Sequence, residues 1–373
     1  MSGFELRRAL SIARKEVRHL WRDPFTLTLA LGLPMLLVVF FGYAIDLESR
    51  DIGLTVQDRD RSRQSRELVE VFSSSGYFDV LAPSDPGRLL NDLDTERAAA
   101  VLIIEPRFGR DLSAGKGASI QFMLDGADNA RASAVLGYLP GIAAAARKRL
   151  LKEPPPSPPL ALATRFLYNP ELNSRWFIIP GLCVVVMGLL SIMLTALTVA
   201  REWENGSMEL LLSTPVHPLE IIAGKLLPYM ALCLLNVVLV YLVARLGFGV
   251  PFRGSHLLFA LASFMFLAAC LAWGIVISVA TRQQQLSMQL SIVTGLLPSF
   301  LLSGFIFPVE SMPVFFQYFT SILPQRWYMA VTRDVFLKAS GPLELAVPLA
   351  ALLAMDAVLI TAAVRRFKTD LEP

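Results

Sequence analysis

The hydrophobic positions of the chain gather into blocks that are long enough to cross a membrane. About 20 apolar residues suffice to span the hydrocarbon core as a helix. Uncharged apolar runs of this length occupy residues 24–45, 176–200, 226–244, 254–281 and 283–309. A sixth run, 343–364, holds one acidic residue, Asp356, whose insertion cost its apolar neighbours outweigh. The pattern predicts a polytopic α-helical membrane protein with six transmembrane helices and both termini on one side.

Lysine and arginine residues in the short segments set the expected orientation. Most of them lie on the side of the termini, in segments that include residues 1–23 and the tail 365–373. Cytoplasmic segments carry an excess of such residues, so we expect both termini to be cytoplasmic. The first run is too long for a signal peptide and continues into Asp46, which indicates an uncleaved anchor at 24–45.

The N-terminal segment 1–23 combines apolar and basic positions. The apolar residues that recur at helical spacing are Leu6, Leu10, Ala13, Val17, Leu20 and Trp21. Basic residues fall mostly between them, which predicts an amphipathic helix at the cytoplasmic surface of the bilayer, with its basic side facing anionic head groups. Packing on a soluble partner is the alternative that the same pattern allows.

Between the first two runs, residues 46–175 have the mixed composition of a soluble domain. Strand-like stretches at 52–57, 78–81, 99–104 and 119–124 alternate with helix-like ones at 62–73 and 87–97. This alternation predicts a small α/β extracytoplasmic domain inserted between transmembrane helices 1 and 2. A longer helical stretch, 129–151, precedes a proline-rich run at 154–159, which we expect to be a stiff extended spacer.

Composition narrows the classes of function. Hydrophobic residues make up 54% of the chain and charged residues 17%, and the net charge is only +3. This near balance, with no basic run interleaved with aromatic residues, argues against a nucleic-acid binder. The three cysteines lie inside apolar runs without paired spacing, so neither a metal site nor a disulfide framework is expected.

No motif for catalysis stands out. A chain that hydrolyses ATP needs a phosphate-binding loop of the form GxxxxGK followed by Ser or Thr, and the sequence contains none. The histidines are scattered, and no paired carboxylates or Gly-x-Ser-x-Gly motif falls on a span. We therefore expect no catalytic residue and no cofactor on this chain. Asn236 and Asp356, which are polar residues within the spans, are candidates for a substrate pathway, with a buried structural hydrogen bond as the alternative.

The most informative polar segment is the cytoplasmic loop 201–215. Asn205 and Gly206 predict a turn, Ser207 can cap a short helix, and Pro215 ends it. Glu209 lies in the first turn, where the helix dipole favours a negative charge. The apolar side of this helix consists of Met208, Leu211 and Leu212. An apolar side on a loop indicates a docking helix for a protein partner, with packing on this chain's own helix ends as the alternative.

A second segment outside the spans, 308–340, is rich in aromatic residues. Aromatic residues concentrate at the level of the lipid head groups, so this segment is predicted to be a re-entrant hairpin on the outer face. A plain surface loop is the alternative interpretation.

Several short motifs together resemble those of a known family. They are Tyr168-Asn169-Pro170-Glu171, Arg201-Glu202-Trp203-Glu204, Gly206, Met208-Glu209, Thr214-Pro215, Gly224-Lys225, Pro228-Tyr229, Phe307-Pro308 and Met312-Pro313. Over nearly its whole length the chain resembles the permease subunits of type 2 ABC exporters, in the multidrug or efflux-type subgroup with a large extracytoplasmic domain after the first span. Ser207 stands where the family usually has threonine, and the proline run at 154–159 is a departure from its pattern.

The resemblance implies a permease of the bacterial inner membrane that works with separate ATPase subunits, which hold ATP and Mg. It also implies a second permease, identical or related, and a possible periplasmic adaptor protein. The residues implied to couple to the ATPase are Arg201, Glu202, Glu204, Gly206, Met208, Glu209, Leu211, Leu212 and Pro215.

Small residues of the second and fifth spans suit close helix contact at the dimer interface and the pathway. They include Gly181, Gly188, Gly295 and Gly304. The rival interpretation is a membrane-anchored ligand-binding or sensory protein whose outer domain binds a ligand. A membrane enzyme acting on lipid would need a polar catalytic cluster, which the sequence does not present.

Overall fold

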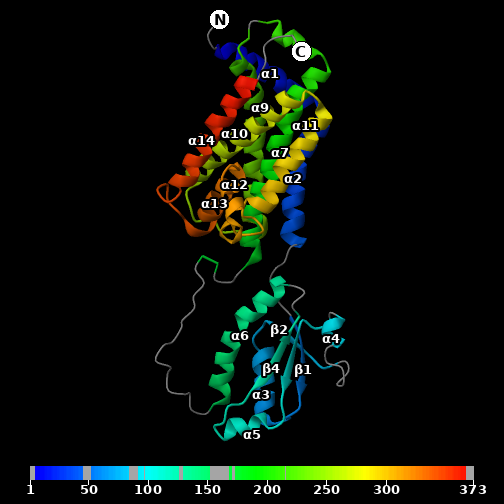
Figure 1. The fold of residues 1–373 in the computed structure, drawn as a ribbon, viewed down its shortest axis with the longest axis vertical. Coiled ribbons are helices and arrows are strands. Elements are labelled where there is room, and N and C mark those ends of the chain that lie inside the picture. Colours follow the sequence, from blue (N-terminus) through cyan, green and yellow to red (C-terminus); the bar gives the residue numbers. More distant parts are fainter. Residues whose placement is uncertain are drawn as a thin grey trace. The chain divides into compact units, whose positions relative to one another are not determined.

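The chain divides into two compact units, one made of Met1–Ile45 with Leu167–Pro373 and the other of Asp46–Phe166 (Figure 1). They are seen in a computed structural model. The residues that the structure describes are 5–44, 52–83, 91–95, 97–125, 129–151, 168–169, 173–214 and 216–366.

The first unit is a bundle of membrane-length helices. Among the described residues, six helices are long and apolar enough to cross a membrane, which confirms the predicted number. They are α2 (Pro24–Ala44), α7 (Ser174–Glu204), α9 (Pro218–Leu242), α10 (His256–Thr281), α11 (Gln284–Ser291) and α14 (Ala346–Arg366). Wider π-helical turns extend α9 by η1 (Val243–Gly247) and α11 by η2 (Ile292–Leu296) and η3 (Pro298–Leu302).

Two of these helices run further into polar sequence than their hydropathy predicts. Helix α7 continues to Glu204, and α9 begins at Pro218 instead of near residue 226. The start of α9 is fixed by a capping box, in which His217 caps the helix and the Glu220 carboxylate accepts from the His217 backbone amide at 2.9 Å. The charged turns are therefore helical because their polar groups find partners.

Helix α7 is the central element of the bundle and contacts α2, α9, α10 and α11 (Figure 1). Its contact with α10 is closest at Gly274. A Cβ atom there would lie 2.1 Å from Thr195 Oγ1 and 2.3 Å from the carbonyl oxygen of Ile192. Thr195 Oγ1 also donates to the carbonyl of Leu271 at 2.8 Å. Small residues that let backbones approach in this way are typical of helix contacts in membranes.

The glycines that we expected at a dimer interface make contacts within the chain. A Cβ at Gly181 would meet the ring of Phe305 at 2.4 Å, and one at Gly188 would meet Gln325 at 3.3 Å. A Cβ at Gly295 would lie 3.3 Å from Ile192. These positions are therefore used for packing inside the first unit.

Shorter helices lie at the two ends of the bundle (Figure 1). At one end, α1 (Leu6–Arg22) packs against α9 through Ala9, Ile12 and Leu20. At the other end, the segment 308–340 forms η4 (Val309–Ser311), α12 (Val314–Thr320), α13 (Pro324–Arg333) and η5 (Asp334–Lys338). Helix α13 is buried, and its Tyr328 ring stacks on Phe266 at 4.2 Å. Helix α12 instead exposes the aromatic rings of Phe315 and Tyr318.

The second unit is an α/β structure around a four-stranded sheet. The strands are β1 (Ile52–Asp58), β2 (Phe78–Leu81), β3 (Ala100–Ile104) and β4 (Ile120–Leu124), in the order β2-β1-β3-β4. The helices are α3 (Arg63–Ser73), α4 (Asn91–Asp94), α5 (Phe108–Ser113) and α6 (Asn129–Leu150). β1 pairs in parallel with β2 and β3, and β3 pairs antiparallel with β4. The proline run 154–159 lies outside the described residues.

The loops after β1 and β3 are joined by one carboxylate. Asp60 accepts backbone hydrogen bonds from Arg107 at 2.7 Å and Gly109 at 2.9 Å. Arg107 has a left-handed backbone with φ of 79°, which this contact stabilises. The Ser62 hydroxyl, followed by these amides, lowers the pKa of Asp60 below its usual value.

The α7–α10 contact yields a first prediction. Gly274→Ala overpacks the helix crossing, and overpacking costs about 1 to 3 kcal/mol. We expect a melting temperature several degrees lower for the full chain in detergent. Gly32→Ala is the matched control in a span, because a Cβ there meets nothing closer than Thr28 at 4.0 Å. Equal melting of the two variants would contradict this role of Gly274.

A second prediction concerns pH. The folded state lowers the pKa of Asp60, so the ionised carboxylate stabilises the fold at pH values above the ordinary aspartate pKa of about 3.9. This stabilisation is lost as the pH falls below that value. We expect the amides of Arg107 and Gly109 to lose exchange protection there, measured by hydrogen exchange and corrected for intrinsic rates. Asp60→Asn should remove this pH dependence, whereas Asp79→Asn, at an exposed acid on β2, should leave it. The same profile in all three proteins would overturn the assignment.

Candidate functional site

The end of the bundle that carries α1 gathers segments that are far apart in sequence. Here α1 meets the last turns of α7, the short helix α8 (Ser207–Leu212) and the first turns of α9. The starts of α2 and α11 also lie at this junction, through contacts of Asp23 and Gln284 with Arg201. This junction contains residues 201–214 of the predicted loop, so it is the candidate functional site.

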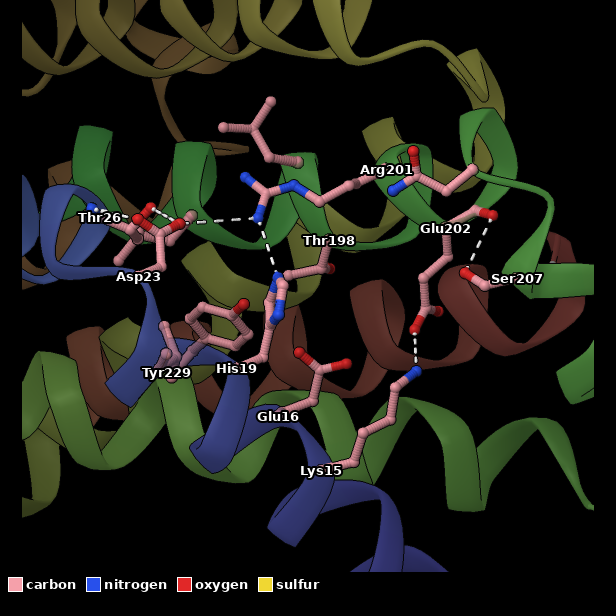
Figure 2. A pocket seen from close by; sticks show the side chains of 14 residues that line it. Lys15, Glu16, His19, Asp23, Thr26, Thr198, Arg201, Glu202, Ser207 and Tyr229 are labelled. Atoms are coloured by element: carbon pink, nitrogen blue, oxygen red, sulfur yellow. Dashed lines mark hydrogen bonds and ion pairs between the residues drawn. The ribbon is translucent and has the colours of Figure 1, made fainter.

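A buried lysine holds three helices together. Lys225 Nζ of α9 lies 3.1 Å from Glu16 Oε1 of α1 and 2.7 Å from Glu202 Oε2 of α7. Only 1% of the Lys225 side chain is exposed. Lys15 adds a second cation from α1, with its Nζ 2.6 Å from Glu202 Oε1, as Figure 2 shows. The two carboxylates are therefore compensated by two ammonium groups, one buried and one half-exposed.

Sequence analysis did not single out Glu16 or Lys225 as members of a site, although a signal exists for the first. Glu16 lies four residues after Ile12 and four before Leu20, on the face of α1 that is buried. An acid on the apolar face of an amphipathic helix needs a buried cation as its partner. Which cation that is cannot be read from the sequence, because Lys225 lies 209 positions away.

Arg201 connects the corner between α1 and α2 to α7. Its Nη1 lies 3.2 Å from His19 Nε2 and 3.9 Å from Asp23 Oδ2 (Figure 2). Its Nε donates to Gln284 Oε1 at 3.4 Å. Because arginine can only donate, His19 Nε2 must accept and the ring is neutral with its proton on Nδ1. The hydroxyl and amide of Thr26 both donate to Asp23, and they lower the pKa of this carboxyl.

Glu204 and Trp203 tie the end of α7 to the start of α11. The Glu204 carboxylate accepts from the backbone amide of Gln284 at 2.7 Å and also from its side-chain amide. The guanidinium of Arg282 lies 4.4 Å from the centre of the Trp203 ring, a cation–π distance. The acid that we expected to be a partner contact thus positions the neighbouring span.

The predicted turn and short helix of the loop are both present. Gly206 has a φ of 69°, which a glycine adopts without strain, and α8 follows at once. Met208 is 1% exposed and packs with Ile12, Ile221 and Ile275. In this structure Met208 therefore faces the chain's own helix ends, which was the alternative interpretation, and does not line a surface open to a partner.

The outward face of α8 differs from the one expected. Leu211 is partly buried against the cluster around Met208, whereas Leu210 is 73% exposed. Pro215 and the side chains of Glu209 and Leu212 lie outside the described residues. Leu210 was missed because the register of a helix of six residues is decided by what it packs against, and no periodicity can be read over so short a length.

The two candidates for a substrate pathway, Asn236 and Asp356, lie apart from this junction. Asn236 of α9 is 2% exposed, and its amide donates to the carbonyl of Ala30 in α2, which is a structural hydrogen bond between spans. Asp356 of α14 is 9% exposed, and its Oδ1 finds no hydrogen-bond partner among the described residues. No hydrogen bond or ion pair within the described part of the chain joins the two.

A cavity of about 180 Å³ lies between α1 and α7 at the junction (Figure 2). Its ionisable lining residues are Lys15, Glu16, His19, Asp23, Arg201, Glu202 and Tyr229. Leu20, Leu194 and Leu197 form an apolar wall. In the described part of the chain, no group of three or more His, Cys, Asp or Glu side chains is arranged to hold a metal ion.

Comparison with known proteins gives consistent matches over both units. The family model described as ABC-2 family transporter protein matches residues 24–365. The Escherichia coli K12 protein named "Probable multidrug ABC transporter permease YbhS" is 33% identical over 357 residues, covering 95% of this chain and 95% of that protein. "Probable multidrug ABC transporter permease YbhR" of the same strain is 30% identical, covering 89% and 90%. "Inner membrane transport permease YhhJ" is 28% identical, with 97% of each chain covered.

The buried network yields a third prediction. Lys225→Met leaves two carboxylates without their buried cation, and breaking a buried pair in this way costs about 3 to 5 kcal/mol. Lys15→Met removes a half-exposed partner of the same Glu202 and should cost at most about 1 kcal/mol. Melting of the purified full chain in detergent measures both.

A second variant separates charge from packing. Adding Glu16→Gln to Lys225→Met removes one uncompensated carboxylate and should restore part of the lost stability. If Lys15→Met and Lys225→Met destabilise the chain equally, burial of Lys225 is not what holds the three helices together.

Proposed function

The chain belongs to the ABC-2 family of transporter proteins and is a membrane-embedded permease subunit of an ABC transporter, and from this premise we propose that it works as an exporter. It moves an amphiphilic or drug-like substrate out of the cytoplasm or the inner membrane. Separate ATPase subunits, which bind ATP and Mg, supply the energy. The names of the two E. coli relatives as multidrug permeases support this class of substrate.

The observation that carries the proposal is the anchoring of α8. Met208 packs this helix against α1, α9 and α10, while Leu210 remains exposed on its other side. The residues just before it are fixed as well, because Glu202 pairs with Lys225 and Glu204 binds Gln284. A partner that displaces α8 would therefore also displace α7, α9 and α11, because these helices are connected to it by direct contacts.

We assign different parts in coupling to these residues according to their contacts within the chain. Arg201, Glu202, Glu204 and Met208 transmit movement within the chain, since each is held by contacts to another helix. Leu210 supplies the apolar contact to the ATPase. Gly206 sets the turn. Glu209, Leu211, Leu212 and Pro215 keep the coupling role that the family resemblance gives them.

The proposal also assigns sides and partners. We place the α1 end, with both termini, in the cytoplasm of a bacterial cell, and the second unit outside it. A second permease, identical or related, pairs with this chain in the bilayer. The spans with the most exposed surface offer room for both lipid and this partner, because only 24% of α2, 22% of the fifth span and 11% of α14 are buried. A periplasmic adaptor protein is a further partner of the second unit.

The fourth prediction tests the ATPase contact. We expect Leu210→Ser to reduce the amount of ABC ATPase that co-purifies with the tagged chain from detergent by about tenfold or more, the loss typical of a central apolar contact. The captured ATPase is identified and quantified by mass spectrometry.

The control is another exposed leucine. Leu246, on η1 at the far end of the third span, is 80% exposed, and Leu246→Ser should leave ATPase capture unchanged. Both variants must melt at the temperature of the natural chain. Full capture by Leu210→Ser, or no capture by the natural chain, would count against coupling through α8.

A further inference from the structure

The cavity between α1 and α7 has a charge pattern that the coupling role does not require. We propose that it binds a zwitterionic group of the phosphoethanolamine type, with the ammonium inside and the phosphate at the rim, supplied by a phospholipid head group. Binding of this kind needs neither ATP nor an ATPase, so it stands apart from the proposed export.

The interior of the cavity is acidic. Glu16 and Glu202 are both buried and share one buried cation, Lys225. The second cation on Glu202 is Lys15, whose side chain is 56% exposed and reaches in from the solvent. Lys15 and Lys225 together balance the two carboxylates, but only Lys225 is buried, so the buried groups taken alone carry one negative charge in excess. A bound ammonium group would balance this charge in a place where an unpaired charge is costly.

One tyrosine hydroxyl is open to the same cavity. Tyr229 is 5% exposed and lines the cavity, and its hydroxyl makes no hydrogen bond with another described residue. Figure 2 shows its hydroxyl on the side of the ring that faces His19. This hydroxyl oxygen can accept a hydrogen bond from a bound ammonium group, beside the Glu16 carboxylate that also lines the cavity.

The rim is basic. Lys15 and Arg201 carry positive charges at the mouth against the single carboxylate of Asp23, and His19 Nδ1 adds a donor. A phosphate here would gain charge-assisted hydrogen bonds from the guanidinium. The rim opposes entry of a pure cation, and the interior opposes a pure anion. A group with an ammonium and a phosphate a few ångströms apart meets both charges.

Position and size agree with a head group. The cavity lies beside the first turn of α2 and the last turns of α7, where span ends meet the head-group layer. Its 180 Å³ compares with the roughly 10 to 15 Å³ that a single water needs, so a small organic group fits. Leu20, Leu194 and Leu197 offer apolar contact to the attached chain.

The test uses the full chain in detergent without nucleotide. Native mass spectrometry measures adducts with dihexanoyl phosphatidylethanolamine, phosphatidylcholine and phosphatidylglycerol, each titrated separately. We expect phosphatidylethanolamine to bind about tenfold more tightly than phosphatidylcholine, because a trimethylammonium group cannot donate a charged hydrogen bond to Glu16 or Tyr229. Equal binding of these two lipids, or tighter binding of phosphatidylglycerol, would overturn the proposal.

Variants locate the site. Tyr229→Phe keeps the ring and should reduce the preference for phosphatidylethanolamine at least threefold, and Glu16→Gln should abolish it. Tyr241→Phe is the matched control, since Tyr241 lies further along α9, does not line the cavity and bonds to His256 instead. A preference unchanged in both Tyr229→Phe and Glu16→Gln would place binding elsewhere and refute the assignment.

A competition experiment with a soluble compound identifies the source of the ligand. O-phosphoethanolamine without acyl chains should compete only at concentrations at least about a hundredfold higher, because it lacks the apolar contacts of the lipid chain. Competition at the same concentration as the lipid would overturn the lipid as the source and leave a free zwitterion as the ligand.

Discussion

A buried ammonium group sets the geometry of the α1 end of the bundle. Lys225 lies between two carboxylates from helices that are distant in sequence, Glu16 and Glu202. Removing such ions from water costs several kcal/mol each, and only close mutual contact returns that cost. The register of α1 on α9 and of α7 on α9 is therefore not free to slide. The positions of α8, of the α2 corner at Asp23 and of α11 at Gln284 follow, because each is attached to the same last turns of α7.

The rest of the bundle obeys a different physical rule. Within the hydrocarbon there is no hydrophobic force between helices, so contact depends on close packing and a few hydrogen bonds. The crossing of α7 and α10 at Gly274 and the bond from Asn236 to Ala30 are of this kind. One end of the permease is thus held mainly by ion pairs, and its middle is held by close packing of the helices.

Much of the architecture was predictable because it rests on local properties of the sequence. The six spans follow from hydropathy, and the four strands and α3 of the second unit follow from the alternation between 52 and 124, whereas the short helix α5 was not predicted. The site was harder, since burial of a side chain depends on distant neighbours. The glycine turn at Gly206 was predicted from local sequence and is present. Met208 facing inward, Leu210 facing outward and the Glu16–Lys225 pair all depend on packing between segments that only the folded chain brings together.

The fifth span has one further property. Its second half, Ile292–Leu296 and Pro298–Leu302, winds in π-helical turns, which hold more residues per turn than an α-helix. A π-helical turn contains one residue more than the α-helical turn that could replace it. If it rewound as α-helix, the part of the span beyond it would rotate by about 100°. The span can therefore absorb a one-residue deletion in this stretch by rewinding, with its far end still facing the same neighbours. Single-residue deletions among related chains should therefore be tolerated here and excluded at the α7–α10 crossing.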